Sequence, residues 1–547
     1  MRIFFENSSI LAEKVKAALE GNDINLAVSL LEDTQNYAAV KTGSSELVPV
    51  IAKYVCSEYE SENSDLFTAC SKLLEKVVEV ALVEDILVQL LELVEISDST
   101  NLSIILTNVF KVLRRAPREK TKLLGWSVNS IQVRLNKCTI PEYGVTSVRS
   151  DNDVFYIEIL YQDVLHFYDL IIPFYSEYFL TNEEYRLILI KYLIQLLAKP
   201  MGYLDLGPHN EKTKLRKMAE NIVRKILSIC NDPFTYLSMD EEDSLNPTIF
   251  AYGMFLHFLL DENTDYALIP RVYTSTYIFR ASLIYITKLL KSYSNLVILK
   301  GFCTLEMLFN RTPKLSHLIL EIEANEGLCE VMEKIVVYNQ YQEMRQRALD
   351  VFKLYLHKFV PKGQYLLLTN LIFKIQHSGL SGYMITQYKE ILFEMQQKQH
   401  PEVSNFEGDK MYIFIKKCYG TIDSEGAFQY DKIVSLLNLM RFAVVQVKTE
   451  DCEKFRRVSN AWREQFFNRL ESSLEKLKRV IRQKIFNVEN DSPEPNFEFS
   501  LHFEDAEDID SLSKPKKLES LQSSLTEIEM TESLLKRVIE LLEEKNC

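Results

Sequence analysis

Residues 455–485 read FRRVSNAWREQFFNRLESSLEKLKRVIRQKI. Apolar residues follow one another along this stretch at intervals of three or four, which is the periodicity of one face of an α-helix. They are Phe455, Val458, Trp462, Phe466, Leu470, Leu474, Leu477, Ile481 and Ile485. Basic residues occupy many of the other positions. The stretch therefore predicts one long amphipathic helix whose apolar stripe packs into a groove between neighbouring helices.

The same spacing recurs along almost all of the 547 residues. Short polar breaks such as SDST at 97–100 separate the helical runs, and the chain has only 15 glycines and 15 prolines. A chain of this length needs several domains or an elongated array. We therefore predict an all-α fold, an irregular HEAT-like or armadillo-type α-solenoid of stacked helix pairs, with about 40 residues per unit. A stack of ordinary helix bundles is the alternative.

Two longer breaks divide the chain. The first, NDPFTYLSMDEEDSLNP at 231–247, combines two prolines with a charge cluster. It predicts N-terminal helical repeats over 1–240 and C-terminal HEAT-like repeats over 241–547. The second, at 487–517, predicts an acidic disordered loop between the last two long helices, because 489–510 holds nine carboxylates and no Lys or Arg.

The acidic loop follows directly on the basic side of the helix at 455–485. One hypothesis is that the loop lies loosely over these basic residues. The alternative is two independently solvated charge runs, since exposed ion pairs contribute only ~0–1 kcal/mol each.

The composition limits the classes of binding partner and the cellular compartment that are expected. The net charge of −14 disfavours nucleic-acid binding, because an acidic surface repels phosphate backbones. No run approaches the ~20 apolar residues that cross a membrane, and the first residues lack the apolar core of a signal peptide. Nine scattered cysteines without any CxxC motif predict reduced thiols, neither disulfides nor a zinc site, and a cytoplasmic or nuclear location. We expect a monomer.

The motifs of nucleotide-binding and hydrolytic enzymes are absent: GxxxxGK[ST], GxGxxG, HExxH and GxSxG do not occur. Asp163 and His166 share a helix face, but a metal site would need matching ligands from other helices. We interpret them, and His257, as satisfied structural residues. The aromatic stretch at 154–179 predicts a core helix pair broken at Pro173. No catalytic residue, cofactor or metal is therefore expected, and the protein is predicted not to be an enzyme.

Five collinear stretches point to a family. They are RQRALDVFKLY at 345–355, KGQY at 362–365, HSG at 377–379 where a helix begins, LNLMR at 437–441, and ESLLKRVIEL at 532–541. In order and spacing they resemble the glomulin family, HEAT-like inhibitors of cullin–RING ubiquitin ligases. The resemblance is strongest over about 230–545 and faint before that.

The resemblance implies a partner and a mechanism. Glomulin-like proteins bind the RING domain of the RING-box subunit with their C-terminal repeats. They thereby cover the surface that receives the ubiquitin-conjugating enzyme. The partner-binding residues we expect are Arg537, Glu540 and Leu541 on the last helix, with Arg441 and Asn438 on the neighbouring repeat. A different class of function is the alternative: an α-solenoid scaffold or adaptor in transport or tethering, with no role in ubiquitination.

Helical spacing separates the two sides of the last helix. One set of residues recurs every three or four positions and is expected to pack on the preceding repeat. This set is Glu532, Leu535, Val538, Ile539 and Leu542. Arg537, Glu540 and Leu541 fall on or beside another face.

Overall fold

The structure is a computed structural model of the chain. It describes residues 2–96, 101–116, 120–141, 151–207, 213–238, 245–261, 272–321, 323–422, 429–447, 452–490 and 513–545. Over these ranges the regular elements are helices, and an isolated β-bridge pairs Leu315 with Phe359. The chain is an all-α solenoid of packed helices, which confirms the predicted fold class.

The helices fall into two compact units, Met1–Leu308 and Phe309–Cys547. We call them unit 1 and unit 2 and describe each by itself. The boundary predicted after residue 240 stays a prediction, and the described residues place a 3₁₀-helical segment at Pro233–Ser238.

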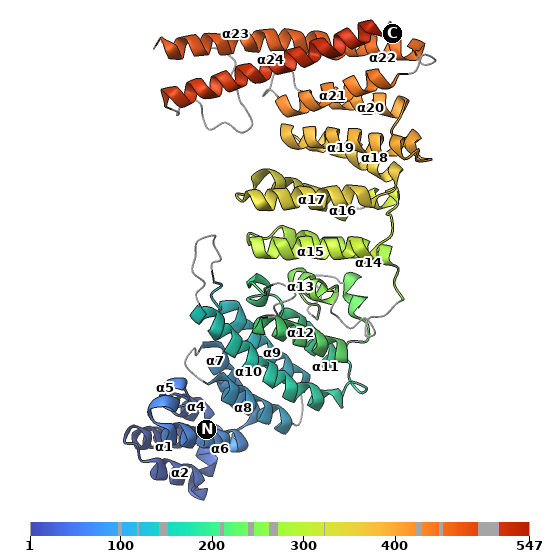
Figure 1. Cartoon of the computed structure of the whole chain (residues 1–547). Coiled ribbons are helices and arrows are strands. Elements are labelled where there is room, and N and C mark those ends of the chain that lie inside the picture. The colour runs from blue at the N-terminus through green and yellow to red at the C-terminus, as the bar shows by residue number, and fades with distance from the viewer. Residues whose placement is uncertain are drawn as a thin grey trace. The chain divides into compact units, whose positions relative to one another are not determined.

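In unit 1 the helix α1 is followed by the short helices α2 to α5 and then by longer ones (Figure 1). They are α1 (Arg2–Glu20), α2 (Ile24–Glu32), α3 (Tyr37–Thr42), α4 (Ser44–Ala52), α5 (Ser57–Glu62), α6 (Ser64–Val80), α7 (Val83–Ile96), α8 (Leu102–Arg115), α9 (Lys120–Lys137), α10 (Asp151–Ser176), α11 (Glu184–Gln195), α12 (Lys214–Ile229), α13 (Ile249–Leu259), α14 (Ser275–Leu290) and α15 (Asn295–Arg311). From α8 onward each packs mainly on helices one or two places away in the chain, as α8 does on α7 and α10. This is the neighbour-to-neighbour packing of a solenoid.

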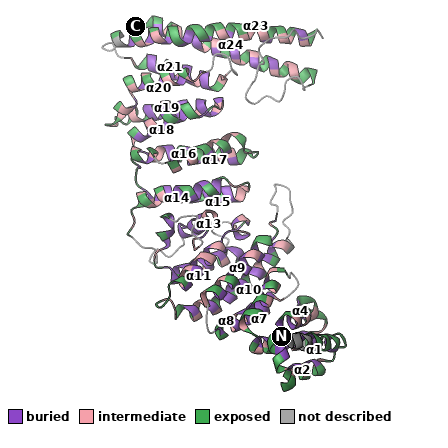
Figure 2. Cartoon of the chain, turned by 180° about the vertical axis from the view of Figure 1, so that it is seen from behind, coloured by how far each residue is buried: buried purple, intermediate pink, exposed green. Residues whose placement is uncertain are grey.

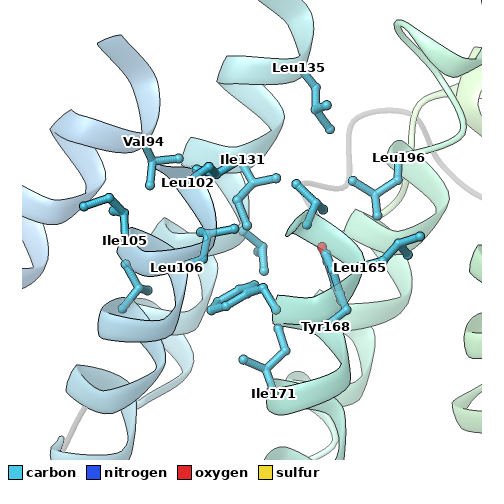
Figure 3. Close-up of a cluster of buried hydrophobic side chains, with 14 of the residues drawn as sticks. Val94, Leu102, Ile105, Leu106, Ile131, Leu135, Leu165, Tyr168, Ile171 and Leu196 are labelled. Carbon is cyan, nitrogen blue, oxygen red and sulfur yellow. The ribbon is translucent and has the colours of Figure 1, made fainter. Parts of the chain in front are cut away.

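The core of unit 1 is a continuous apolar layer between adjacent helices. Figure 3 shows the part of it that α7 to α11 contribute. The buried side chains there are Val94, Leu102, Ile105, Leu106, Ile131, Leu135, Leu165, Tyr168, Ile171 and Leu196. Burying each side chain of this size stabilises the fold by about 1.5–3 kcal/mol, so packing of such stripes holds the helices together.

The prediction that the aromatic stretch is broken at Pro173 is wrong. Helix α10 continues through Pro173 and ends at Ser176. The proline stands in the last turn, where its missing N–H removes a single hydrogen bond. Tyr168 and Tyr175 on either side of it are fully buried, so aromatic packing continues along the helix past the proline.

Unit 2 consists of helix pairs followed by a long terminal pair. The helices are α16 (Glu323–Tyr338), α17 (Gln342–Lys358), α18 (Pro361–Lys374), α19 (Ser378–Gln397), α20 (Asp409–Gly420), α21 (Tyr430–Gln446), α22 (Cys452–Trp462), α23 (Asn468–Glu489) and α24 (Lys514–Glu544). Figure 1 shows α16 with α17, α18 with α19 and α20 with α21 as successive layers. A Cβ atom added to Gly382 would lie 2.7 Å from the carbonyl oxygen of Asp431, so α19 and α21 need a glycine where they meet.

The stretch at 455–485 forms a helix with one interruption. A π-helical turn at Arg463–Phe467 separates α22 from α23. The extra residue in that turn brings both Phe466 and Phe467 into the core, at 5% and 1% exposure. Of the nine predicted stripe residues six are buried, and Val458, Leu477 and Ile485 are half-buried. Figure 2 shows the buried residues concentrated where helices face one another. Across the described ranges, no helix has the length and apolar character needed to cross a bilayer.

Candidate protein-binding surface

The second half of α24 is held from two sides. Helix α24 packs on α21 and on α23. Leu535, Val538 and Leu542 are buried against them, with exposures of 2%, 0% and 5%, whereas Glu532 and Ile539 are half-buried. The predicted inward stripe is confirmed for the three buried residues. The spacing of three and four positions thus fixes which face of α24 is left for a partner.

The opposite face of α24 carries the three residues expected to bind a partner. Arg537 and Glu540 are exposed, and Leu541 is half-buried at the edge of the core. One guanidinium nitrogen of Arg537 lies 3.0 Å from a carboxylate oxygen of Glu540 and 3.4 Å from one of Glu544. The hydrogen bond to Glu540 raises the pKa of Arg537 further above its ordinary value. The face therefore presents a permanent, oriented pair of opposite charges.

The other two predicted residues, Asn438 and Arg441, lie on α21, beside the part of α24 that carries Arg537. The two helices run in the same direction. Near one end burial, and after it the charge of nearby Asp431, raises the pKa of Glu527; at the other end the ammonium of Lys545 lies 3.1 Å from the carbonyl oxygen of Val447. Since both helices rise by the same amount per residue, Arg441 lies level with the turn at 537–541 of α24. The structure thus places the two sets at the same level along neighbouring helices.

The two α21 residues differ in availability. Arg441 is exposed to solvent. Asn438 is half-buried, and its amide nitrogen donates a hydrogen bond of 3.0 Å to the carbonyl oxygen of Val434 on its own helix. Arg441 is accordingly the stronger candidate for a partner contact, and the Asn438 side chain keeps only part of its hydrogen-bonding capacity free.

Two apolar residues near this face were not found by sequence reasoning. Val445 on α21 is 58% exposed, and Phe393 on α19 is 49% exposed. The Phe393 ring meets the Phe442 ring edge to face at 6.4 Å between centroids. Both residues fit the apolar spacing of their helices, so the sequence alone assigns them to the core. Exposed apolar groups beside an arginine are typical of protein interfaces.

We use the name α21–α24 surface for the exposed and half-buried residues that lie at this level of the two helices. It comprises Asn438, Arg441, Val445, Arg537, Glu540 and Leu541.

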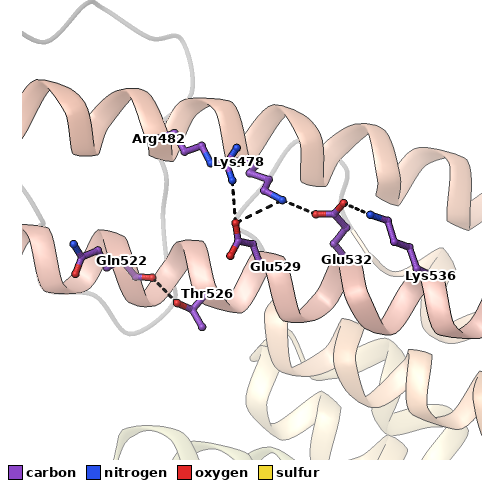
Figure 4. Close-up of polar contacts among 7 residues, drawn as sticks. All are labelled: Lys478, Arg482, Gln522, Thr526, Glu529, Glu532 and Lys536. Carbon is purple, nitrogen blue, oxygen red and sulfur yellow. Dashed lines mark hydrogen bonds and ion pairs between the residues drawn. The ribbon is translucent and has the colours of Figure 1, made fainter.

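Ion pairs connect α23 with α24, the helix that carries part of this surface (Figure 4). Lys478 lies 2.7 Å from a carboxylate oxygen of Glu532 and 3.6 Å from one of Glu529, which also pairs with Arg482 at 3.0 Å. Lys536, one turn further along α24, pairs with Glu532 at 2.7 Å. Hydrogen bonds from the two lysines lower the pKa of Glu532 to about 2. These contacts link the two antiparallel helices along their surface.

The histidines and carboxylates singled out in the sequence make structural contacts. Burial raises the pKa of Asp163, and His166 opposes this rise. The Nδ1 atom of His257 lies 3.1 Å from the hydroxyl oxygen of Thr304, so the interpretation of His257 as a hydrogen-bonded residue is confirmed. Within the ranges that the structure describes, His, Cys, Asp and Glu side chains form no group that could hold a metal ion.

The predicted acidic loop at 487–517 lies largely outside the described residues. Helix α23 continues to Glu489 and α24 begins at Lys514, so the helices include both ends of that interval. Residues 491–512 lie outside the described ranges. The hypothesis that this segment covers the basic side of α23 stays a prediction.

The fold and the α21–α24 surface together define a class: an α-helical solenoid protein with an exposed, mixed charged and apolar patch on its terminal helices. No protein-family model matches the sequence. Human glomulin is 21% identical over 569 aligned positions, which cover 96% of this chain and 92% of the human protein. Mouse glomulin is 20% identical over 574 positions, with the same coverage of both chains.

Over nearly its whole length the chain is similar to glomulin. The resemblance seen in the C-terminal half is confirmed, and it extends over nearly the whole chain rather than fading before residue 230.

Proposed function

We propose that this protein inhibits cullin–RING ubiquitin ligases by binding the RING-box subunit with its C-terminal repeats. The bound protein would block access of the ubiquitin-conjugating enzyme. The relationship with glomulin implies a non-catalytic, adaptor-type protein that acts through protein–protein contacts. Inhibition of this kind needs no catalytic step. It requires only that this protein and the conjugating enzyme compete for one surface of the RING-box subunit.

The observation that carries this proposal is the α21–α24 surface. It combines an oriented charged pair, Arg537 and Glu540, with an exposed arginine and an exposed valine on the neighbouring helix. Arginine is favoured among the residues that dominate binding energy, and apolar side chains around it exclude water from the contact. Both helices are held by buried stripes, so the surface is preorganised and loses little conformational entropy when a partner binds.

A reconstituted discharge reaction tests the proposal. The protein is titrated into a mixture of a RING-box–cullin complex and a ubiquitin-loaded conjugating enzyme. We expect the discharge rate to fall with increasing protein, and an excess of conjugating enzyme to restore it, because the two compete for one surface. Unchanged discharge, together with no co-elution of the protein and the RING-box subunit in size-exclusion chromatography, would refute the proposal and leave the scaffold alternative.

A further inference from the structure

The α23–α24 pair has a strongly basic end. In Figures 1 and 2 the pair extends beyond α20 and α21 on the side where α23 finishes and α24 begins. We call this end, residues 476–490 and 513–520, the basic tip. It holds eight basic residues and two acidic ones, a net charge of +6 in a chain of net charge −14. The basic residues are Lys476, Lys478, Arg479, Arg482, Lys484, Lys514, Lys516 and Lys517.

Ion pairs within the protein leave most of this charge at the surface. Lys478 and Arg482 are engaged by carboxylates of α24. Arg479 is 82% exposed, and its contact with Glu475 on the same helix is 3.5 Å long. Lys476 and Lys516 are exposed as well. An anion in solution can therefore reach several cations at once.

The dipole of α24 opposes the charge of the three lysines at its start, and Lys514 also donates a hydrogen bond of 3.5 Å to the carbonyl oxygen of Glu489 at the end of α23. Lys514, Lys516 and Lys517 stand in the first turn of a 31-residue helix whose first turn has no acidic residue. The first turn is the positive end of the helix dipole, where cations are unfavourable and anions are stabilised. Residues that oppose local stability in this way are expected where function requires them.

An exposed aromatic residue completes the tip. Phe486 is 57% exposed. It follows Lys476, Arg479 and Gln483 at intervals of three and four, so these residues form one outward stripe of α23. From Lys476 to Asn490 the stripe is about 21 Å long, from the helical rise per residue. About six residues of extended chain cover this length.

We propose that the basic tip binds an acidic segment of a partner protein, about six residues or longer, which includes an aromatic or large apolar residue that packs on Phe486. A short segment experiences only the local positive charge, because salt screens charges beyond about 8 Å. A long nucleic acid would also meet the acidic remainder of the chain. The tip is about 35 Å along α24 from Arg537, by helical rise, so this site is separate from the α21–α24 surface.

Fluorescence anisotropy with a labelled peptide tests the proposal on the full-length protein. The probe is a peptide of glutamates with two phenylalanines, and the reference peptide carries glutamine in place of every glutamate. We expect binding of the glutamate peptide that weakens by about tenfold or more from low to moderate salt, as for contacts between exposed charges. Binding of the glutamine peptide with equal affinity would overturn the proposal.

Charge reversal locates the site. The variant Lys476→Glu, Arg479→Glu, Lys516→Glu should lose about tenfold or more in affinity for the glutamate peptide. The matched control, Lys334→Glu, Lys362→Glu, Lys416→Glu, makes the same charge change at exposed positions of α16, α18 and α20 and should stay within about twofold of the natural protein. Equal losses in both variants would show only an effect of net charge and would overturn the proposal. Circular dichroism confirms that both variants are folded.

Two further arms examine the partner class. Phe486→Ser should weaken binding of the peptide with phenylalanines and leave binding of an all-glutamate peptide unchanged.

The sequence at 491–510 is itself acidic. A full-length variant with amides in place of the carboxylates of 491–510 should therefore bind the glutamate peptide at least as tightly as the natural chain, and weaker binding would count against the site. Tighter binding of single-stranded RNA or of phosphatidylserine vesicles than of the peptide would overturn the assignment to a protein partner.

Discussion

Unit 1 buries some of its charged side chains in its interior, whereas the ion pairs between α23 and α24 lie at the surface. In unit 1 a guanidinium nitrogen of Arg216 lies 2.5 Å from a carboxylate oxygen of Asp261, and the two residues are 5% and 6% exposed. Lys300 is also buried and donates hydrogen bonds to the carbonyl oxygens of Gly202 at 2.6 Å and Leu204 at 2.8 Å. These groups have no access to a partner.

The ion pairs of the terminal helices are placed differently. The side chain of Arg482 is 59% exposed and that of its partner Glu529 is 46% exposed. Water competes with such pairs, so each contributes only ~0–1 kcal/mol to stability. The buried charge of unit 1 therefore specifies how its helices pack, because a buried ion left alone is strongly unfavourable. Charge on α23 and α24 is instead available for exchange with a partner.

The largest effect is expected from Arg216→Met. The substitution leaves the buried carboxylate of Asp261 without its partner, and breaking a buried pair in this way destabilises by about 3–5 kcal/mol. Urea denaturation followed by circular dichroism measures the free energy of unfolding. The double variant Arg216→Met, Asp261→Leu should recover a large part of the loss, because it no longer buries an unpaired charge. A single variant as stable as the natural protein would remove the distinction between the two regions.

Lys300→Met is expected to have the next largest effect, and one that depends on pH. It leaves the carbonyl oxygens of Gly202 and Leu204 without a donor, a loss of about 1–3 kcal/mol. Burial lowers the pKa of Lys300 from 10.5 to about 7. Between these two values the unfolded chain binds the proton that the folded protein has released, so the natural protein gains stability as pH rises from 7 towards 10.5.

The measurement is the difference in unfolding free energy between the natural protein and Lys300→Met at pH 7 and at pH 9. Using a difference removes the contributions of the tyrosines and cysteines that both proteins share. We expect the destabilisation by the substitution to be larger at pH 9. A difference that shrinks with rising pH would mean that Lys300 stays charged in the folded protein, and that its two carbonyl hydrogen bonds outweigh its burial.

The amino-acid sequence gives little indication of which charged residues are buried. The sequence predicts the apolar stripes well, because periodicity of three and four directly reports which face of a helix is covered, as for Leu535, Val538 and Leu542. Lys300 gives no such signal. Its hydrogen-bond partners lie 98 and 96 residues earlier in the chain. The sequence pattern around Lys300 on α15 is that of an ordinary solvent-exposed lysine. Its burial is seen only in the folded structure.

The candidate surface was predictable in part for the same physical reason. The exposure of Arg537, Glu540 and Arg441 follows from their helical positions relative to buried neighbours. The exposure of Val445 and Phe393 does not, because both residues belong to apolar patterns and become accessible only where the stacked helices leave a side open. Sequence patterns therefore predict charged members of an interface better than apolar ones.

A partner-binding role for the exposed charges is tested by Arg537→Glu. The reversal places a third carboxylate beside Glu540 and Glu544 and removes the cation, so affinity for the RING-box subunit should fall by roughly 30-fold, as at an interface hot spot. Titration calorimetry measures the affinity, and circular dichroism should stay native. Arg280→Glu, an equal change at an exposed position of unit 1, serves as the control and should bind normally. Normal binding by Arg537→Glu would remove this residue from the surface.

The smallest effect is expected from Glu532→Gln, which weakens the bonds to Lys478 and Lys536 without removing the side chain. The pKa of Glu532 is lowered to about 2 in the folded protein, so its contribution is fully present above its ordinary pKa of 4.5 and is lost as the pH falls towards 2.

Because its side chain is 27% exposed and screened by water, the loss at pH 7 should be only about 0.5 kcal/mol, and the natural and variant proteins should converge in unfolding free energy as the pH falls below 4. Added salt should reduce the difference at neutral pH. If Glu532→Gln instead destabilised the protein as much as Arg216→Met, the α23–α24 ion pairs would be part of the protein's packing. They would then be too costly to break for a partner to displace them.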